Sequence, residues 1–174
     1  SSLAAAGLVK AKETKGKKVL LLFEGAMSEP QVYLNGKKVG EWAYGYSYFY
    51  FDVSQFIQEG NNTLAVKLSN KEFASRWYPG AGLYRKVSVI IKNKESIDQW
   101  GQFITTPFIS DAVAKVNIKT KASGENTRLV TTIFDAEGHK VSAEESSLRF
   151  GKEFDQNLKV ENPKLWSPET PYLY

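Results

Sequence analysis

The segment Ser75–Arg85 concentrates side chains that suit sugar recognition; it reads Ser-Arg-Trp-Tyr-Pro-Gly-Ala-Gly-Leu-Tyr-Arg. Pro79 restricts one backbone angle, whereas Gly80 and Gly82 admit angles that are closed to other residues. Aromatic rings offer flat surfaces for the apolar C–H face of a sugar, and guanidinium groups offer planar hydrogen-bond donors to its hydroxyls. We therefore predict a shaped loop that contacts carbohydrate through four residues, namely Ser75, Arg76, Trp77 and Tyr78.

The aromatic residues also have a purely structural interpretation. Trp77 and Tyr84 are candidates for core anchors that hold the loop in shape, which leaves Arg76 as the stronger functional candidate. The run from Trp42 to Phe51 places tyrosines on one alternation and phenylalanines on the other. We interpret most of this run as packing, in a sandwich core or at a domain interface, with a sugar-contacting face as the alternative.

The elements that position this loop read as β-strands. Residues 83–91 follow the loop as a strand with valines and an isoleucine on one face. The apolar run 19–24 is typical of a strand buried on both faces, and 63–68 alternates. Asn35-Gly36 between 31–34 and 37–41 predicts a hairpin with a type I′ turn. These strands are fewer than the eight of a complete jelly roll, so we expect an exposed sheet edge unless residues 8–12 or another chain covers it.

The second half of the chain predicts a second sandwich. Its expected strands are 100–106, 112–120, 128–135, 139–148 and 154–160, separated by turns rich in Gly, Asn and Asp. Residues 92–97 are polar and lack periodicity, so we place a domain boundary there. The prediction is an all-β chain with domains at 1–94 and 95–174.

Composition excludes several classes of function. The 174 residues carry 23 Lys and Arg against 19 Asp and Glu, and the lysines are scattered, so we expect no nucleic acid partner. The absence of cysteine excludes disulfides, a zinc-thiolate site and a cysteine nucleophile. No apolar run approaches the roughly 20 residues that cross a bilayer, so no membrane partner is expected. We predict no cofactor and no metal site.

A catalytic carboxylate pair is not evident either. Cleavage of a glycosidic bond generally needs two carboxylates about 5 to 10 Å apart. The acidic residues flank turns or end strands, where capping or solvation explains them: Glu24, Glu29, Glu41, Asp52 and Asp98. His139, the one histidine, is interpreted as a surface residue. We therefore predict no catalytic residue in this chain.

Four motifs, in order, resemble the N-terminal region of glycoside hydrolase family 2, the family of β-galactosidases, β-glucuronidases and β-mannosidases. They are Val32-Tyr-Leu-Asn-Gly-Lys-Lys-Val-Gly40, Arg76-Trp-Tyr-Pro-Gly-Ala-Gly-Leu-Tyr-Arg85, Trp100-Gly-Gln-Phe-Ile-Thr-Thr-Pro107 and Leu165-Trp-Ser-Pro-Glu-Thr-Pro-Tyr-Leu-Tyr174. The resemblance covers residues 19–174. It implies a truncated, galactose-binding-like jelly roll followed by an immunoglobulin-like sandwich.

The resemblance also implies a function. In the family both catalytic glutamates lie on a (β/α)8 barrel that follows the immunoglobulin-like domain, and we expect this chain to be the non-catalytic part ahead of it. The parent would be a retaining glycoside hydrolase of the β-galactosidase type. Family β-galactosidases carry an acidic residue just before the tryptophan of the loop motif, where this chain has Ser75 and Arg76. That departure puts strict galactose specificity in doubt, and an arginine suits an acidic sugar.

Two other interpretations of the function of this chain stay open. One is a stand-alone carbohydrate-binding module, and another is an adhesin-like structural repeat. The expected partners are a terminal glycoside and the barrel of the same parent chain, with oligomerisation through exposed sheet edges as a further possibility. For the parent, a periplasmic or secreted location is favoured over a cytoplasmic one.

Overall fold

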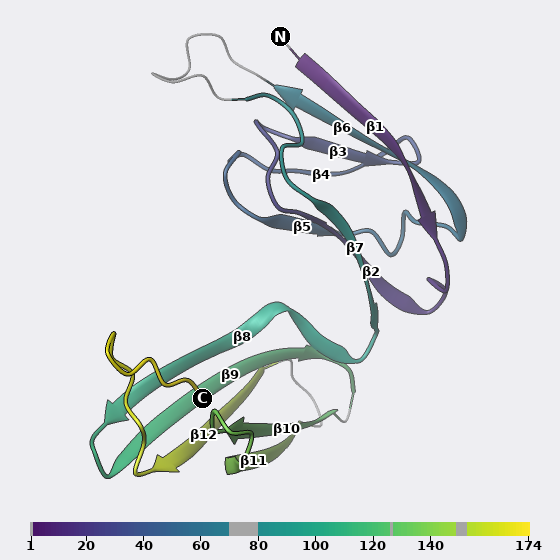
Figure 1. The fold of residues 1–174 in the computed structure, drawn as a ribbon. Helices are drawn as coiled ribbons and strands as arrows, with labels where there is room; N and C mark the ends of the chain where they lie inside the picture. Colours follow the sequence, from purple (N-terminus) through teal and green to yellow (C-terminus); the bar gives the residue numbers. More distant parts are fainter. Residues whose placement is uncertain (1, 70–79, 126, 149–152) are drawn as a thin grey trace. The chain divides into compact units, whose positions relative to one another are not determined.

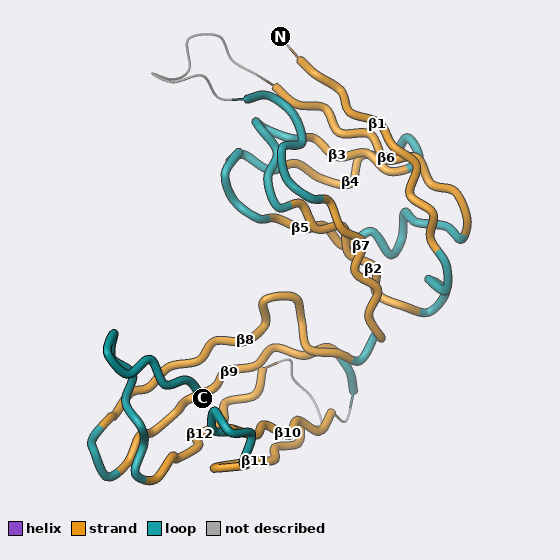
Figure 2. The backbone as a smooth tube through the Cα atoms, in the orientation of Figure 1, coloured by secondary structure: helices purple, strands orange, loops and turns teal. Residues whose placement is uncertain are grey.

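The computed structural model describes residues 2–69, 80–125, 127–148 and 153–174, and all their regular structure is β (Figures 1 and 2). The chain divides into two compact units, Ser1–Lys94 and Glu95–Tyr174. The all-β class predicted from the sequence is confirmed. No helix in the described part of the chain is long and apolar enough to cross a membrane.

Unit 1 is built from two antiparallel sheets. The larger has the order β1-β6-β3-β4 and the smaller the order β5-β2-β7. The strands are β1 Ser2–Ala11, β2 Lys17–Phe23, β3 Gln31–Leu34, β4 Lys37–Glu41, β5 Phe49–Asp52, β6 Gly60–Ser69 and β7 Val87–Asn93.

The core of unit 1 lies between these sheets. It is formed by alternate residues of the central strands, among them Val19, Leu21, Phe23, Val32, Leu34, Phe49, Leu64, Val66 and Leu68. Leu20, on the opposite face of β2, is also fully buried, which confirms a strand covered on both faces. Asn35 and Gly36 have φ angles of 53° and 79°, as the predicted type I′ turn requires.

The edge of β6 is covered within the chain. Strand β1 pairs with β6 along its whole length, from Ser2 opposite Ser69 to Ala11 opposite Gly60. The sequence indicated no strand ahead of residue 8, because an alanine-rich run shows no alternation. Backbone pairing with β6 decides its conformation.

One predicted strand boundary was wrong, since β7 begins at Val87 and not at residue 83. Strand β2 ends at Phe23, where it meets both Phe49 of β5 and Val87 of β7. Residues 83–86 and 42–48 lie beyond that end and have no partner in a ladder, so they are not strand. The aromatic run is therefore mostly a loop, and only its last residues belong to β5.

Unit 2 contains the five predicted strands. A three-stranded sheet has the order β12-β9-β8, and β10 pairs with β11. The strands are β8 Ser96–Ile109, β9 Val113–Ser123, β10 Thr127–Phe134, β11 Lys140–Leu148 and β12 Glu153–Glu161. Phe154, Leu158 and Val160 of β12 are buried and alternate with exposed polar residues, as in a strand with one face toward a core.

A buried amide joins the two sheets of unit 2. The side chain of Gln156 on β12 is fully buried. Its Oε1 accepts a hydrogen bond from Thr131 Oγ1 at 2.6 Å, and its Nε2 donates to the Glu144 carbonyl at 3.3 Å and to Ser146 Oγ at 3.1 Å. One polar residue therefore links β12 to both strands of the second sheet.

Candidate functional site

The four predicted sugar-contacting residues, Ser75, Arg76, Trp77 and Tyr78, lie outside the described residues. The structure does describe the segments on either side of these four residues. Both segments form hydrogen bonds to the dipeptide Met27-Ser28. Ser28 Oγ donates to the Ser69 carbonyl at 2.6 Å, and Ser69 N donates to the Ser28 carbonyl at 2.9 Å. Met27 and Gly82 exchange two backbone hydrogen bonds of 3.0 and 3.1 Å. The two flanks of residues 70–79 are thus held beside each other.

Gly82 makes its hydrogen bonds to Met27 in an unusual backbone conformation. Its φ angle is 124°, a value that side-chain-bearing residues rarely adopt. Gly80, two residues earlier, has no such angle, and a Cβ at either glycine would meet no atom of the described residues within 4 Å. Among the described residues, the backbone angle is what requires glycine at position 82.

Tyr84 anchors the second flank to the rest of unit 1. Its hydroxyl donates to the Gly45 carbonyl at 2.8 Å. Its ring lies against Gly25, where an added Cβ would come within 2.6 Å of the ring. Tyr84 nevertheless stays 44% exposed, so the interpretation as a core residue was wrong: it anchors the loop from the surface.

Three tyrosine rings lie in contact beside the attachment point. Tyr46 meets Tyr84 edge to face at a centroid distance of 6.4 Å, and Tyr44 meets Tyr46 in the same way at 5.8 Å. Tyr44 and Tyr46 are 60% and 50% exposed. We call Tyr44, Tyr46 and Tyr84 the tyrosine ledge. The guanidinium of Arg85 lies 6.0 Å from the centre of the Tyr84 ring, within cation–π range.

The exposure of the ledge shows that Tyr44 and Tyr46 do not lie in the sandwich core, whereas their place at a domain interface stays a prediction. Phe49 is buried against Phe23, with ring centroids 4.8 Å apart, and it packs as predicted. Trp42 stacks on Phe49 and donates from Nε1 to Ser47 Oγ at 2.9 Å, yet it remains partly exposed. The alternation in the sequence hinted at two different faces, but it could not show that the tyrosines leave the sheet altogether.

Several acidic side chains have the structural roles expected for them. Glu41 pairs with Lys38 of the same strand β4 at 2.7 Å, and this hydrogen bond lowers the pKa of Glu41 and raises that of Lys38. Asp52 caps the backbone N–H of Ser54 at 3.0 Å. Asp98 Oδ1 accepts from Ser123 Oγ at 2.8 Å.

His139 lies at the surface of unit 2. The His139 side chain is 77% exposed, as predicted, with Nδ1 3.2 Å from Asp135. Within the described ranges, no three His, Asp or Glu side chains gather closely enough to hold a metal ion.

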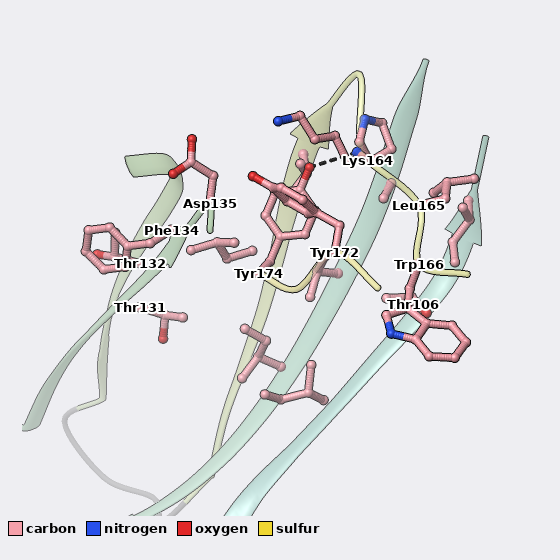
Figure 3. A pocket seen from close by; sticks show the side chains of 18 of the residues that line it. Thr106, Thr131, Thr132, Phe134, Asp135, Lys164, Leu165, Trp166, Tyr172 and Tyr174 are labelled. Carbon is pink, nitrogen blue, oxygen red and sulfur yellow. Dashed lines mark hydrogen bonds between the residues drawn. The ribbon is translucent and has the colours of Figure 1, made fainter. Parts of the chain in front are cut away.

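Unit 2 contains an apolar cavity of about 600 Å³ between its sheets (Figure 3). Its walls include Ile104, Ile118, Ile133, Trp166, Tyr172 and Tyr174. Lys164 N donates to the Tyr174 hydroxyl at 2.9 Å, the dashed line of Figure 3.

Tyr172, at the rim of the cavity, forms a hydrogen bond to the turn between β10 and β11. The Tyr172 hydroxyl donates to the Glu137 carboxylate at 2.7 Å, which raises the pKa of Tyr172. Most of the lining consists of apolar side chains from the two sheets and from the C-terminal segment 163–174, so the space suits apolar groups better than sugar hydroxyls.

Comparison with known proteins matches both units to models of the same protein family. The family model for the sugar binding domain of glycosyl hydrolases family 2 matches residues 7–100, and that for glycosyl hydrolases family 2 matches residues 96–174. The first match begins ahead of residue 19, where the sequence motifs placed the start of the resemblance.

Relatives and solved structures agree with these matches. A β-galactosidase of Bacteroides ovatus is 34% identical over 94% of this chain and 20% of its own length. A putative β-glucuronidase of Formosa agariphila is 32% identical over 94% of this chain and 16% of its own length. The crystal structure of a glycosyl hydrolase family 2 member from Bacteroides cellulosilyticus has a TM-score of 0.88 at 27% identity, covering 98% of this chain and 25% of that one.

The chain spans about a fifth of the length of the curated relatives it matches, such as the Bacteroides ovatus β-galactosidase, of which it covers 20%. The two family models together account for residues 7–174. The chain belongs to glycosyl hydrolase family 2.

Proposed function

We propose that this chain is the non-catalytic N-terminal part of a family 2 glycoside hydrolase of the β-galactosidase type. Residues 1–94 and 95–174 are then two domains. The first lends its 75–82 loop to the rim of an active site, and the second sets the position of a catalytic (β/α)8 barrel of the same parent chain. The reaction of that parent is retaining hydrolysis of a terminal glycoside.

The observation that carries the proposal is the attachment of the loop flanks. Ser69 and Gly82 are held on Ser28 and Met27 by four hydrogen bonds of 2.6 to 3.1 Å. These hydrogen bonds fix the two ends of the loop on neighbouring residues, which lowers the entropy cost of holding the ends of the loop at one place. The tyrosine ledge beside it adds exposed rings and hydroxyls, which are the groups that bind sugar faces and sugar hydroxyls.

Arg76 is the residue to which we assign substrate contact or orientation of a barrel residue. Its planar, permanently charged guanidinium suits a sugar carboxylate or a pair of hydroxyls. The relatives include proteins named β-galactosidase and β-glucuronidase, so both neutral and acidic terminal sugars are candidate substrates.

The test uses the full-length parent protein. Arg76→Ala is expected to lower kcat/KM by roughly 10- to 1,000-fold with little change in melting temperature, because it removes a contact to the reacting sugar. Trp77→Ala is the comparison variant, expected to destabilise the first domain by roughly 3 to 5 kcal/mol through loss of a packed indole. Unchanged kinetics for Arg76→Ala in a folded protein would exclude the proposed role. If instead Arg76→Ala unfolds the domain while Trp77→Ala abolishes activity in a folded protein, the two roles are reversed.

A further inference from the structure

The turn of the β3–β4 hairpin contains the one Asn-Gly pair of the sequence, Asn35-Gly36. Asparagine before glycine is prone to spontaneous deamidation, because glycine has no Cβ to shield its backbone nitrogen. In this reaction the backbone nitrogen of Gly36 attacks Cγ of Asn35, the C–N bond of the side-chain amide breaks, and the amide nitrogen leaves as ammonia with the Gly36 proton. Water then opens the succinimide ring to aspartate or isoaspartate.

The fold engages both ends of the Asn35 amide. Its Nδ2 donates to the Phe56 carbonyl at 3.0 Å and to Asn62 Oδ1 at 2.9 Å, and its Oδ1 accepts from Thr63 N at 3.0 Å. The backbone N–H of Asn35 also donates to the Thr63 carbonyl at 2.8 Å. All these partners lie in β6 or in the segment just ahead of it. The amide nitrogen must therefore leave two acceptors before it can depart as ammonia.

The second amide of this network, that of buried Asn62, is fixed in orientation as well. Its Oδ1 accepts from Gln58 N at 2.9 Å, and its Nδ2 donates to the carbonyls of Gln58 at 2.7 Å and Gly60 at 3.2 Å. Backbone groups have a set donor or acceptor character, so turning this amide over would place its oxygen against two carbonyl oxygens. Asn62 Oδ1 thus has to face a donor at position 35.

Neither product of deamidation satisfies this network. An ionised aspartate has no donor, and the oxygen in place of Nδ2 would face two acceptors, the Phe56 carbonyl and Asn62 Oδ1. Isoaspartate inserts its Cβ into the backbone and lengthens a turn whose flanking residues, Leu34 and Lys37, are paired in the ladder. Both products therefore destabilise the contact between the hairpin turn and β6.

We propose that Asn35 is a site of spontaneous deamidation that the native fold of unit 1 protects. The hydrogen bonds of its amide hold the group that must leave, so the reaction proceeds from states in which the hairpin turn has separated from β6. Local openings of this kind cost less free energy than global unfolding and occur within the native ensemble. Because the products cannot restore the native contacts, each reaction leaves unit 1 with a weakened hairpin turn.

The experiment incubates the 174-residue chain in mildly alkaline buffer, with and without denaturing urea, and measures deamidation at each asparagine by peptide mapping and mass spectrometry. Asn35 is expected to react more slowly in the folded chain by about tenfold or more, since its hydrogen bonds must break first. Asn117, followed by the branched Ile118, is the internal control and is expected to stay unmodified in both samples. Equal rates at Asn35 in the two samples, or no reaction in urea, would overturn the proposal.

Variants separate the amide network from general stability. Asn62→Ala removes one partner of Asn35 and is expected to raise the rate of its deamidation in buffer without urea. Val66→Ala, in the core of unit 1, takes no part in the network and is the control; for the same fall in melting temperature it should raise the rate less. An equal rise in both variants would show that the network does not protect Asn35.

The effect of the product is measured without relying on the Asn62 variant. Asn35→Asp reproduces one product directly and is expected to lower the melting temperature of unit 1, because it replaces a donor with an acceptor beside two acceptors. A melting temperature equal to that of the unmodified chain would refute the claim that deamidation weakens the hairpin turn.

Discussion

Replacing Gly82 with alanine tests whether the backbone at the loop flank is as constrained as the structure indicates. An added Cβ meets no atom of the described residues within 4 Å, so the substitution introduces no clash with them. It does place a side chain on a residue whose φ angle is 124°. That region is essentially restricted to glycine, and occupying it costs about 1 to 3 kcal/mol. We expect Gly82→Ala to destabilise unit 1 by this amount.

Gly80 provides the matched control. It is two residues away and equally open, but it has no positive φ angle. Alanine at position 80 is expected to be neutral or to stabilise by up to about 1 kcal/mol, because it restricts the unfolded chain. Denaturant unfolding of the two variants isolates the effect of the backbone angle.

The size of the effect is measurable in a domain of this size. A loss of 2 kcal/mol in a domain of 60 to 100 residues lowers the melting temperature by about 8 to 16 °C. The chain has one alternative to tolerating the strain, which is to give up the two hydrogen bonds between Met27 and Gly82. Amide hydrogen exchange at Met27 distinguishes that outcome, since its N–H would lose protection. Equal stability of the two alanine variants would refute the reasoning.

Two other substitutions probe unit 2. Gln156→Leu keeps the volume of the side chain but removes the hydrogen bonds to Thr131 Oγ1 and to the Glu144 carbonyl. We expect the free energy of unfolding, measured with denaturant, to fall by about 2 to 4 kcal/mol. A change within about 0.5 kcal/mol, the scatter of surface substitutions, would mean that these hydrogen bonds are dispensable. Asp135 is partly desolvated, but hydrogen bonds from the backbone N–H groups of His139 and Glu137 outweigh this and lower its pKa. Because the folded-state pKa is the lower one, the stabilisation is complete above about pH 4 and is lost as pH falls through the folded-state pKa. Melting curves from pH 6 to pH 2 are expected to fall less steeply for Asp135→Asn, and identical slopes would contradict the assignment.

The sequence by itself determined those features that depend on neighbours along the chain. Asn35-Gly36 specifies its turn because both residues tolerate positive φ angles, and alternation in β6 and β12 specifies which side chains face a core. The family motifs likewise occupy short stretches, so the membership of the chain was evident from them. The proposed site residues 75–78 were predicted from composition and motif, and they stay a prediction.

Only the tertiary structure decided the features that depend on distant partners. Ala-rich β1 is a strand because β6 lies beside it, and residues 42–48 are a loop because β2 ends at Phe23. The sequence does not distinguish Gln156 from other polar residues of an alternating strand. Its structural role depends on its hydrogen bonds to Thr131 and Glu144, which lie on other strands. The bulge in β8 between Ile97 and Gln102 arises from a mismatch in length between two paired strands. Each of these is set by hydrogen bonds between residues far apart in the chain, and local sequence pattern carries no record of such pairings.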